Sequence, residues 1–389
     1  MRSFRITSVW GIPINVNVSL LVFLPILAYL IASGPQIELY AGVVETLSGE
    51  SLDADVLRAG STPWLIGTVA AVGLFASVAV HELGHSWVAL RYDLTVTSIT
   101  LWLLGGLASF DRLPREPHKE FWIAIAGPIT SLAVAAGCYA AVLVVPASAP
   151  ALLFVAGWLA VTNLVLAGFN MLPAFPMDGG RVLRAYLARN RPYAAATRTA
   201  ATVGKLFALL FVFVGIFVAF SPLLLLLALF VYTAAGSESR TVMIADLLSG
   251  VTVRDVAMLD RPEVPADASV ATLFDMMLRK RQVAFPVTEG GRVVGAVTMT
   301  DLKGVDPERR PTTTVGDIAA RDLPRIDVDT PAFDALATLS SAPGGIGVVE
   351  ERGQAVGIVT ESDVATALQF RRETDAAAAP QDLGRGDAW

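Results

Sequence analysis

Three polar residues inside a long apolar stretch are the first sign of chemistry in this sequence. His81, Glu82 and His85 form an HExxH pattern within residues 64–91. On a helix, positions i and i+4 share a face, so both imidazoles can reach one metal ion. Glu82 projects about a quarter-turn away, where it can act on water without ligating the metal. Polar groups inside an apolar span are costly and usually functional, which favours a metal site over a chance match.

A catalytic zinc site uses three protein ligands and keeps one position open, so a third ligand is needed. One choice is His118, which lies in a predicted loop. Asp178 is the stronger choice, because it follows a predicted membrane helix in the segment 170–180, which contains two prolines and two glycines. Such broken backbone is tolerated at membrane depth where it lines a cavity or packs on protein. The alternative interpretation is a helix end with a solvated Asp178.

The composition indicates a membrane protein with a soluble C-terminal part. The chain has 389 residues, of which 54% are hydrophobic and 16% charged, with a mean hydropathy of +0.59. Long apolar runs are confined to residues 1–240, and residues 241–389 resemble an ordinary soluble sequence. The net charge of -6 and the lack of a basic stripe exclude nucleic acid as an expected partner.

The apolar runs predict about six membrane-spanning helices. A span needs about 20 largely apolar residues to cross the hydrocarbon of a bilayer. Pro222 divides one long apolar stretch into the last two spans. The predicted spans are 14–34, 64–91, 120–146, 150–172, 203–220 and 222–238.

The charges in the loops predict the orientation of these spans. The loop 35–63 is acidic, whereas the loops 92–119 and 173–202 contain several arginines. Basic loops stay on the cytoplasmic side, so the N-terminus, the C-terminus and the soluble part are all predicted to be cytosolic. We therefore expect a multi-pass protein of the cytoplasmic membrane of a prokaryote.

Together, the two motifs resemble those of the site-2 protease family of intramembrane zinc metalloproteases. The resemblance covers residues 1–240 and rests on His81-Glu82-Leu83-Gly84-His85 and on the segment Asn170 to Gly180. It implies one zinc per chain, held by His81, His85 and Asp178, with Glu82 as the base. A zinc ion in such a site activates water and polarises the scissile carbonyl, and the base moves the proton to the leaving amine.

The same resemblance implies residues that bind the substrate. Asn170 would hydrogen-bond the substrate backbone near the scissile bond. Leu104-Gly105-Gly106-Leu107 resembles the family's re-entrant segment, which helps to hold the substrate extended. The alternative for this segment is a simple turn. Gly127-Pro128 also resembles a family feature, with a kinked packing helix as its alternative.

Residues 252–302 and 314–364 form an internal repeat at an offset of 62 residues. Each copy predicts a strand, a helix, two strands and a second helix; in the first copy these include a helix at 269–281 and strands at 284–287 and 293–298. Two copies of this length indicate a paired module.

Paired copies of this pattern resemble CBS domains, here predicted at 245–304 and 311–368. The resemblance implies an adenine nucleotide bound by the Thr and Asp of each closing motif, namely Thr298 with Asp301 and Thr360 with Asp363. The alternative is that these residues only cap helices, in a structural module or one that forms a homodimer. Residues 343–347 are rich in glycine where the second copy should enter a strand, so we favour the first half-site. Residues 371–389 are predicted to be a disordered tail.

The sequence thus predicts an α-helical polytopic membrane domain at 1–240, followed by a soluble α/β tandem CBS module. Its predicted function is zinc endopeptidase activity on single-span membrane proteins in the lipid bilayer, regulated through the CBS pair. The first alternative is a CBS-regulated ion channel or transporter, which would place polar residues on several spans. The second is an inactive relative that only binds substrates, which the intact Glu82 opposes.

Overall fold

The computed structural model describes residues 3–103, 105–110, 115–259 and 261–378. Leu104 of the predicted re-entrant segment therefore lies outside the described residues. The chain divides into two compact units, Met1–Arg240 and Thr241–Trp389. The predicted fold class, a helical membrane domain followed by an α/β module, is confirmed.

Among the described residues of the first unit, five helices are long and apolar enough to cross a membrane. Each exposes large apolar side chains, such as Leu223 and Leu226, that suit contact with lipid rather than water. The five helices are α4 (Thr62–Arg91), α5 (Pro117–Val144), α6 (Pro150–Asn170), α8 (Tyr193–Phe217) and α9 (Pro222–Leu247).

The first predicted span, 14–34, is only partly right. Its first residues belong to a strand, and the helix α1 begins at Val18 and ends at Ala32. A second helix, α2 (Gly34–Ser48), follows at a bend of 68°, so the pair counts as one broken span or a re-entrant loop. The predicted exterior loop 35–63 therefore contains α2 and the short helix α3 (Ala54–Arg58). The proline at position 35 explains why the helix breaks there.

A four-stranded sheet in the first unit was not predicted. Its strands are β1 (Ser3–Val9), β2 (Ile12–Asn17), β3 (Val96–Trp102) and β4 (Gly105–Phe110), in the order β1-β2-β3-β4. The β2–β3 pairing is parallel and joins Ile14 to Ile99. Short apolar runs do not distinguish strand from helix, and this pairing depends on partners that are distant in the sequence.

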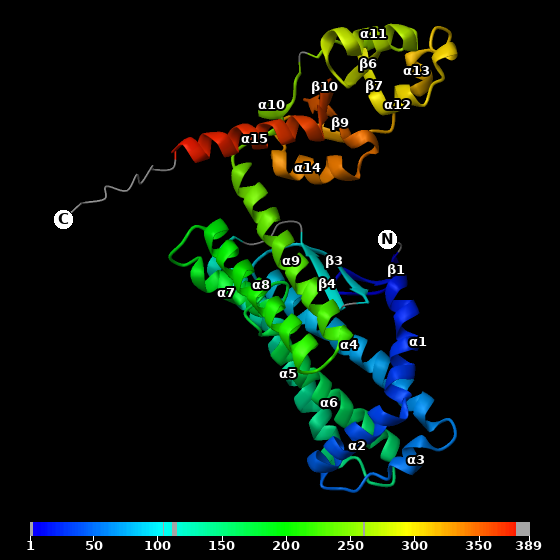
Figure 1. Ribbon diagram of the computed structural model, residues 1–389, viewed down its shortest axis with the longest axis vertical. Coiled ribbons are helices and arrows are strands. Elements are labelled where there is room, and N and C mark those ends of the chain that lie inside the picture. Colours follow the sequence, from blue (N-terminus) through cyan, green and yellow to red (C-terminus); the bar gives the residue numbers. More distant parts are fainter. Residues whose placement is uncertain (1–2, 104, 111–114, 260, 379–389) are drawn as a thin grey trace, which may run out of the picture. The chain divides into compact units, whose positions relative to one another are not determined.

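The helices α4, α5 and α6 pack against one another, and α1, α2 and α3 contribute further side chains to the apolar core of the first unit. The sheet and the short helix α7 (Asp178–Leu187) lie at one end of this unit, and α2 and α3 lie at the opposite end (Figure 1). The end with α7 and the sheet is the end that carries the polar residues of the predicted site.

The second unit contains two three-stranded sheets, one from each copy of the repeat. The first has the order β5-β6-β7 and the second β10-β9-β8. The first copy contains β5 (Val264–Pro265), α11 (Val270–Lys280), β6 (Ala284–Glu289), β7 (Arg292–Thr298) and α12 (Met299–Lys303). The second contains β8 (Arg325–Asp327), α14 (Ala332–Ser341), β9 (Ile346–Glu351), β10 (Gln354–Thr360) and α15 (Glu361–Ala378), with 3₁₀ turns η1 (Pro307–Arg309) and η2 (Pro343–Gly345).

The two copies exchange their first helical turns. The turn α10 (Val253–Val256) packs in the core of the second copy, where the amide of Val253 donates to the carbonyl of Thr330. The turn α13 (Val315–Ile318) packs in the core of the first copy, where the amide of Val315 donates to the carbonyl of Ala268. Each copy therefore completes the core of the other.

Two predictions about the second copy need correction. The glycine-rich segment 343–347 does not remove the strand, because β9 begins at Ile346 directly after the turn η2. Helix α15 runs to Ala378, so residues 371–378 are helical and not disordered. Their alanine, glutamate and arginine have high helix propensity, which allows the helix to continue beyond the packed region. Residues 379–389 of the predicted tail lie outside the described residues.

Candidate metal centre

Helix α4 presents both histidines of the HExxH pattern on one buried face. His81 and His85 are each 4% exposed. Their ring centroids lie 4.8 Å apart with the rings nearly perpendicular, and their Nε2 atoms are 3.1 Å apart. The i, i+4 spacing therefore brings two nitrogen ligands to one point.

Asp178, the first residue of α7, reaches the same point from a distant part of the chain. Its Oδ2 lies 3.2 Å from Nε2 of His81 and 3.2 Å from Nε2 of His85. A tetrahedral zinc site with bonds of about 2.0–2.1 Å separates neighbouring ligand atoms by about 3.3 Å. The three atoms are thus spaced as one face of such a site, and these residues fit a zinc ion.

The other ring nitrogens are held by α5, which determines which way the imidazoles point. Nδ1 of His85 donates to the carbonyl of Ile123 at 2.7 Å, and Nδ1 of His81 lies 2.9 Å from Oγ of Ser131. A carbonyl can only accept, so in neutral His85 the proton is on Nδ1 and Nε2 keeps its lone pair for a metal. Partners of this kind orient the ligands of metal sites.

Gly127 forms the wall of the site opposite the histidines. A Cβ atom built on Gly127 would lie 2.2 Å from Nε2 of His85 and 2.6 Å from Nε2 of His81. Any side chain at this position would meet the metal-binding atoms themselves. The tertiary structure thus explains Gly127 of the Gly127-Pro128 pair as a requirement for space at the site.

The segment between α6 and α7 folds back on the start of α7 and buries Asp178. A Cβ on Gly179 would lie 2.3 Å from the carbonyl oxygen of Leu172, so only glycine permits this close approach. Phe175 and Met177 of the segment are buried, and Asp178 is 8% exposed. The alternative of a solvated aspartate at a helix end is therefore wrong.

Glu82 lies beside the glycine segment of β4. A Cβ on Gly106 would lie 2.4 Å from Cγ of Glu82 and 2.8 Å from its Oε1, so the carboxylate packs directly against this strand. Gly105 has a φ of +135°, a backbone conformation that other residues rarely adopt. Gly105 and Gly106 are the first two residues of β4, which pairs antiparallel with β3 and is an edge strand of the sheet.

The structure does not bring the remaining two candidates into the cluster. Asn170 is the last residue of α6 and is half-buried. His118 is exposed; its Nε2 accepts a hydrogen bond from Trp122 at 3.2 Å and its ring contacts Tyr92. Within the described ranges, the cluster with metal-ligand geometry at this site contains two histidines and one aspartate, and His118 is outside it.

The four predicted nucleotide-binding residues form two capping boxes in the second unit. Oδ2 of Asp301 accepts from the amide and the hydroxyl of Thr298, at 2.8 and 2.7 Å. Oδ2 of Asp363 accepts from the same two groups of Thr360, at 2.8 and 2.9 Å. The helix-capping role is therefore present at both sites.

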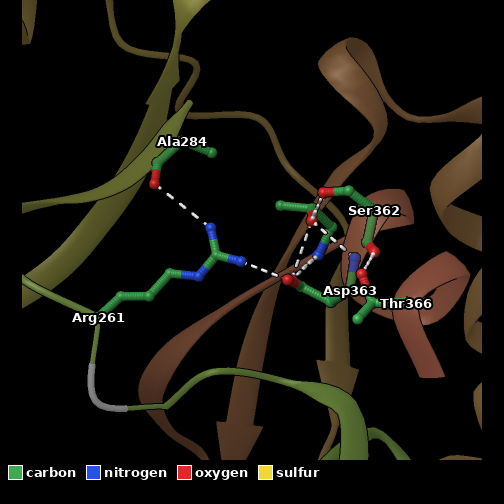
Figure 2. Close-up of polar contacts among 6 residues, drawn as sticks. Arg261, Ala284, Ser362, Asp363 and Thr366 are labelled. Carbon is green, nitrogen blue, oxygen red and sulfur yellow. Dashed lines mark hydrogen bonds and ion pairs between the residues drawn. The ribbon is translucent and has the colours of Figure 1, made fainter. Parts of the chain in front are cut away.

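The two boxes differ in what their second carboxylate oxygen meets. Oδ1 of Asp363 forms an ion pair with the guanidinium of Arg261, which also donates to the carbonyl of Ala284 at 3.3 Å (Figure 2). Arg261 is 9% exposed and Asp363 is 5% exposed. Among the described residues, Asp301 has no ion-pair partner and is less buried. The charge of the second half-site is thus neutralised from within the chain.

Sequence reasoning missed the residues that support both sites. Neither Ser131 nor Ile123 can be recognised from the sequence as a partner of the histidines, because serine is a common small residue and Ile123 contributes only its backbone carbonyl. Arg261 lies shortly before the strand β5, and its partner Asp363 is 102 positions away in the sequence, so no local pattern predicts their contact. Glu120 is the first residue of the predicted span 120–146, and an ionisable residue there could have been predicted to be functional. In the structure it is buried.

Comparison with known proteins gives a consistent picture. The profile of peptidase family M50 matches residues 69–150 and 146–213, and that of the CBS domain matches residues 253–307 and 315–369. Zinc metalloprotease Rip3 of Mycobacterium tuberculosis is 36% identical over 340 residues, which are 83% of this chain and 86% of that protein. Zinc metalloprotease MJ0392 of Methanocaldococcus jannaschii is 32% identical over 299 residues, which are 76% of this chain and 84% of that protein. A solved structure of the site-2 protease from the same organism is 33% identical, covers 61% of this chain and 96% of its own, and has a TM-score of 0.42.

Proposed function

This chain belongs to peptidase family M50, the site-2 protease family of zinc metalloproteases, and from that premise we propose that it cleaves peptide bonds within or near membrane spans of other proteins. It is a multi-pass membrane protein with a C-terminal CBS pair. Family membership removes the channel or transporter as the leading alternative. The observation that carries the proposal is the convergence of His81, His85 and Asp178 at 3.1–3.2 Å inside a bundle of apolar helices.

We assign zinc ligation to these three residues and the role of base to Glu82. When bound, zinc polarises the scissile carbonyl and makes water a better nucleophile. Glu82 directly follows the ligand His81 on α4, but its side chain projects from the helix in a different direction. Its carboxylate can therefore take a proton from the attacking water without ligating the metal. It then returns this proton to the leaving amine nitrogen. Ser131 and the carbonyl of Ile123 keep both imidazoles in place during these transfers.

The edge strand β4 supports the assignment of Gly105 and Gly106 to substrate binding. A membrane helix cannot be cut while its carbonyls are bonded internally, so the substrate must be locally extended. An extended peptide can add to the edge of a sheet through main-chain hydrogen bonds. The contact between Gly106 and Glu82 would bring such a peptide beside the base. Asn170 is assigned to the substrate backbone through the family resemblance.

We propose that both termini face the cytosol, because the basic loops 92–119 and 173–202 belong on that side. The substrates would then be single-span membrane proteins in the cytoplasmic membrane. The cytosolic CBS pair would regulate the protease by binding an adenine nucleotide, or would serve as a dimerising module.

For the nucleotide we favour the half-site of Thr298 and Asp301. A ribose hydroxyl needs a carboxylate oxygen that is free to accept, and Arg261 already occupies that oxygen of Asp363. A ligand at Thr360 and Asp363 would first have to break a buried ion pair.

The proposed function is tested with the variant Glu82→Gln in the full-length protein. Since glutamine keeps the shape but cannot take a proton, zinc content should be unchanged and hydrolysis should fall by about 10²–10⁴-fold. Membrane proteomics of cells carrying the variant should show uncut single-span proteins. Glu116→Gln, at an exposed carboxylate, is the matched control and should behave as wild type. Near-normal cleavage by Glu82→Gln would disprove the assignment of the base.

A further inference from the structure

A buried arginine with several partners lies on the helix that begins with Asp178 and takes no part in the chemistry described above. Arg184, on α7, is 2% exposed. Its Nη2 lies 2.5 Å from Oε1 of Glu120 on α5, and its Nη1 lies 2.6 Å from Oε1 of Glu238 on α9. The guanidinium carbon lies 4.9 Å from the ring centroids of both Phe175 and Tyr193.

The partners of Arg184 keep its guanidinium in the charged form. Burial lowers the pKa of Arg184, but attraction chiefly to Glu120 raises it more, so the net shift is upward and the guanidinium stays charged. Buried ion pairs of this kind often stabilise a protein no more than apolar residues of the same size. The gain in stability therefore does not explain why the chain carries this cluster.

The cluster joins the elements that build the metal centre. Arg184 and Asp178 lie on the same short helix, α7. The contacts that hold Arg184 therefore also hold the helix that carries Asp178. Glu120 is three residues before Ile123, whose carbonyl fixes His85. The Arg184–Glu120 pair thus connects the helix of the third ligand to the helix that orients the histidines. The forked guanidinium can hold two carboxylates at once, which a lysine cannot do in the same geometry.

We propose that Arg184 is a positioning residue that sets the distance of Asp178 from the two histidines through its pair with Glu120. Glu238 and the two aromatic rings hold the same guanidinium from α9, α8 and the segment before α7. The proposal rests on the metal centre described above. It predicts that the cluster controls zinc affinity even when the fold is intact.

The test measures zinc affinity of the full-length protein in detergent by competition with a chromophoric chelator, together with thermal unfolding without metal. Residues that orient metal ligands typically change affinity by about 10–100-fold, and Arg184→Lys should fall in this range. The single variant Arg184→Met leaves Glu120 buried and unpaired, so it can fail to fold. The double variant Glu120→Gln with Arg184→Met removes both charges and should recover the unfolding temperature, yet keep at least about tenfold weaker zinc binding.

Glu116→Gln is the matched control, because it breaks the exposed pair of Glu116 and Lys119 near the same end of α5. It should leave zinc affinity unchanged. Wild-type zinc affinity in a folded double variant would overturn the positioning role. Failure of the wild-type protein to bind zinc would instead refute the metal centre, and this proposal with it.

Discussion

Gly127 lies so close to the two histidines that Gly127→Ala is the most demanding test of the geometry of the metal centre. The added methyl carbon would lie 2.2 Å from Nε2 of His85, 2.5 Å from its Cε1 and 2.6 Å from Nε2 of His81. Non-bonded carbon and nitrogen atoms prefer about 3.5–4.0 Å, so the imidazoles must move by about 1 Å or more. Metal ligands tolerate deviations of only about 0.2 Å. Zinc affinity should therefore fall by at least about 100-fold, which is about 2.7 kcal/mol.

Zinc content by mass spectrometry and chelator competition on purified full-length protein measure this effect. The matched control is Gly137→Ala on the same helix, where an added Cβ meets no atom within 4 Å. Alanine favours a helix over glycine by about 1 kcal/mol, so the control should bind zinc normally and unfold at the same or a higher temperature. One zinc per chain with normal affinity in Gly127→Ala would refute the placement of the two Nε2 atoms at the metal.

Three further experiments test the other assignments. His118→Ala should leave zinc content and cleavage intact, because His118 is exposed and outside the cluster; loss of zinc would show that the third ligand is wrong. Gly106→Ala should lower cleavage at least about tenfold with zinc retained, because its methyl group collides with the Glu82 carboxylate; normal peptidase kinetics would show that this contact is irrelevant to the base. Calorimetry with ATP, ADP and AMP should detect binding that Asp301→Ala abolishes and Asp363→Ala leaves in place. The opposite pattern would exclude the favoured half-site, and no heat with any nucleotide would leave the pair as a structural or dimerising module.

Sequence alone was sufficient for features that depend on neighbours along the chain. A helix repeats every 3.6 residues, so the spacing of His81 and His85 places both rings on one face wherever the helix lies. Apolar runs of about 20 residues predict spans for the same local reason. The internal repeat likewise predicted the helix and strands of the first CBS copy, from Ser269, which caps α11, to Thr298 at the end of β7.

Only the tertiary structure decided what meets across long distances in the sequence. Asp178 reaches His81 from 97 positions away, and β2 finds β3 across more than 80 residues. The need for glycine at position 127 appears only when α4 and α5 are packed. Arg261 meets Asp363 only because the two CBS copies complete one another. Periodicity and composition describe one segment at a time, whereas these contacts depend on which segments pack together and at what separation.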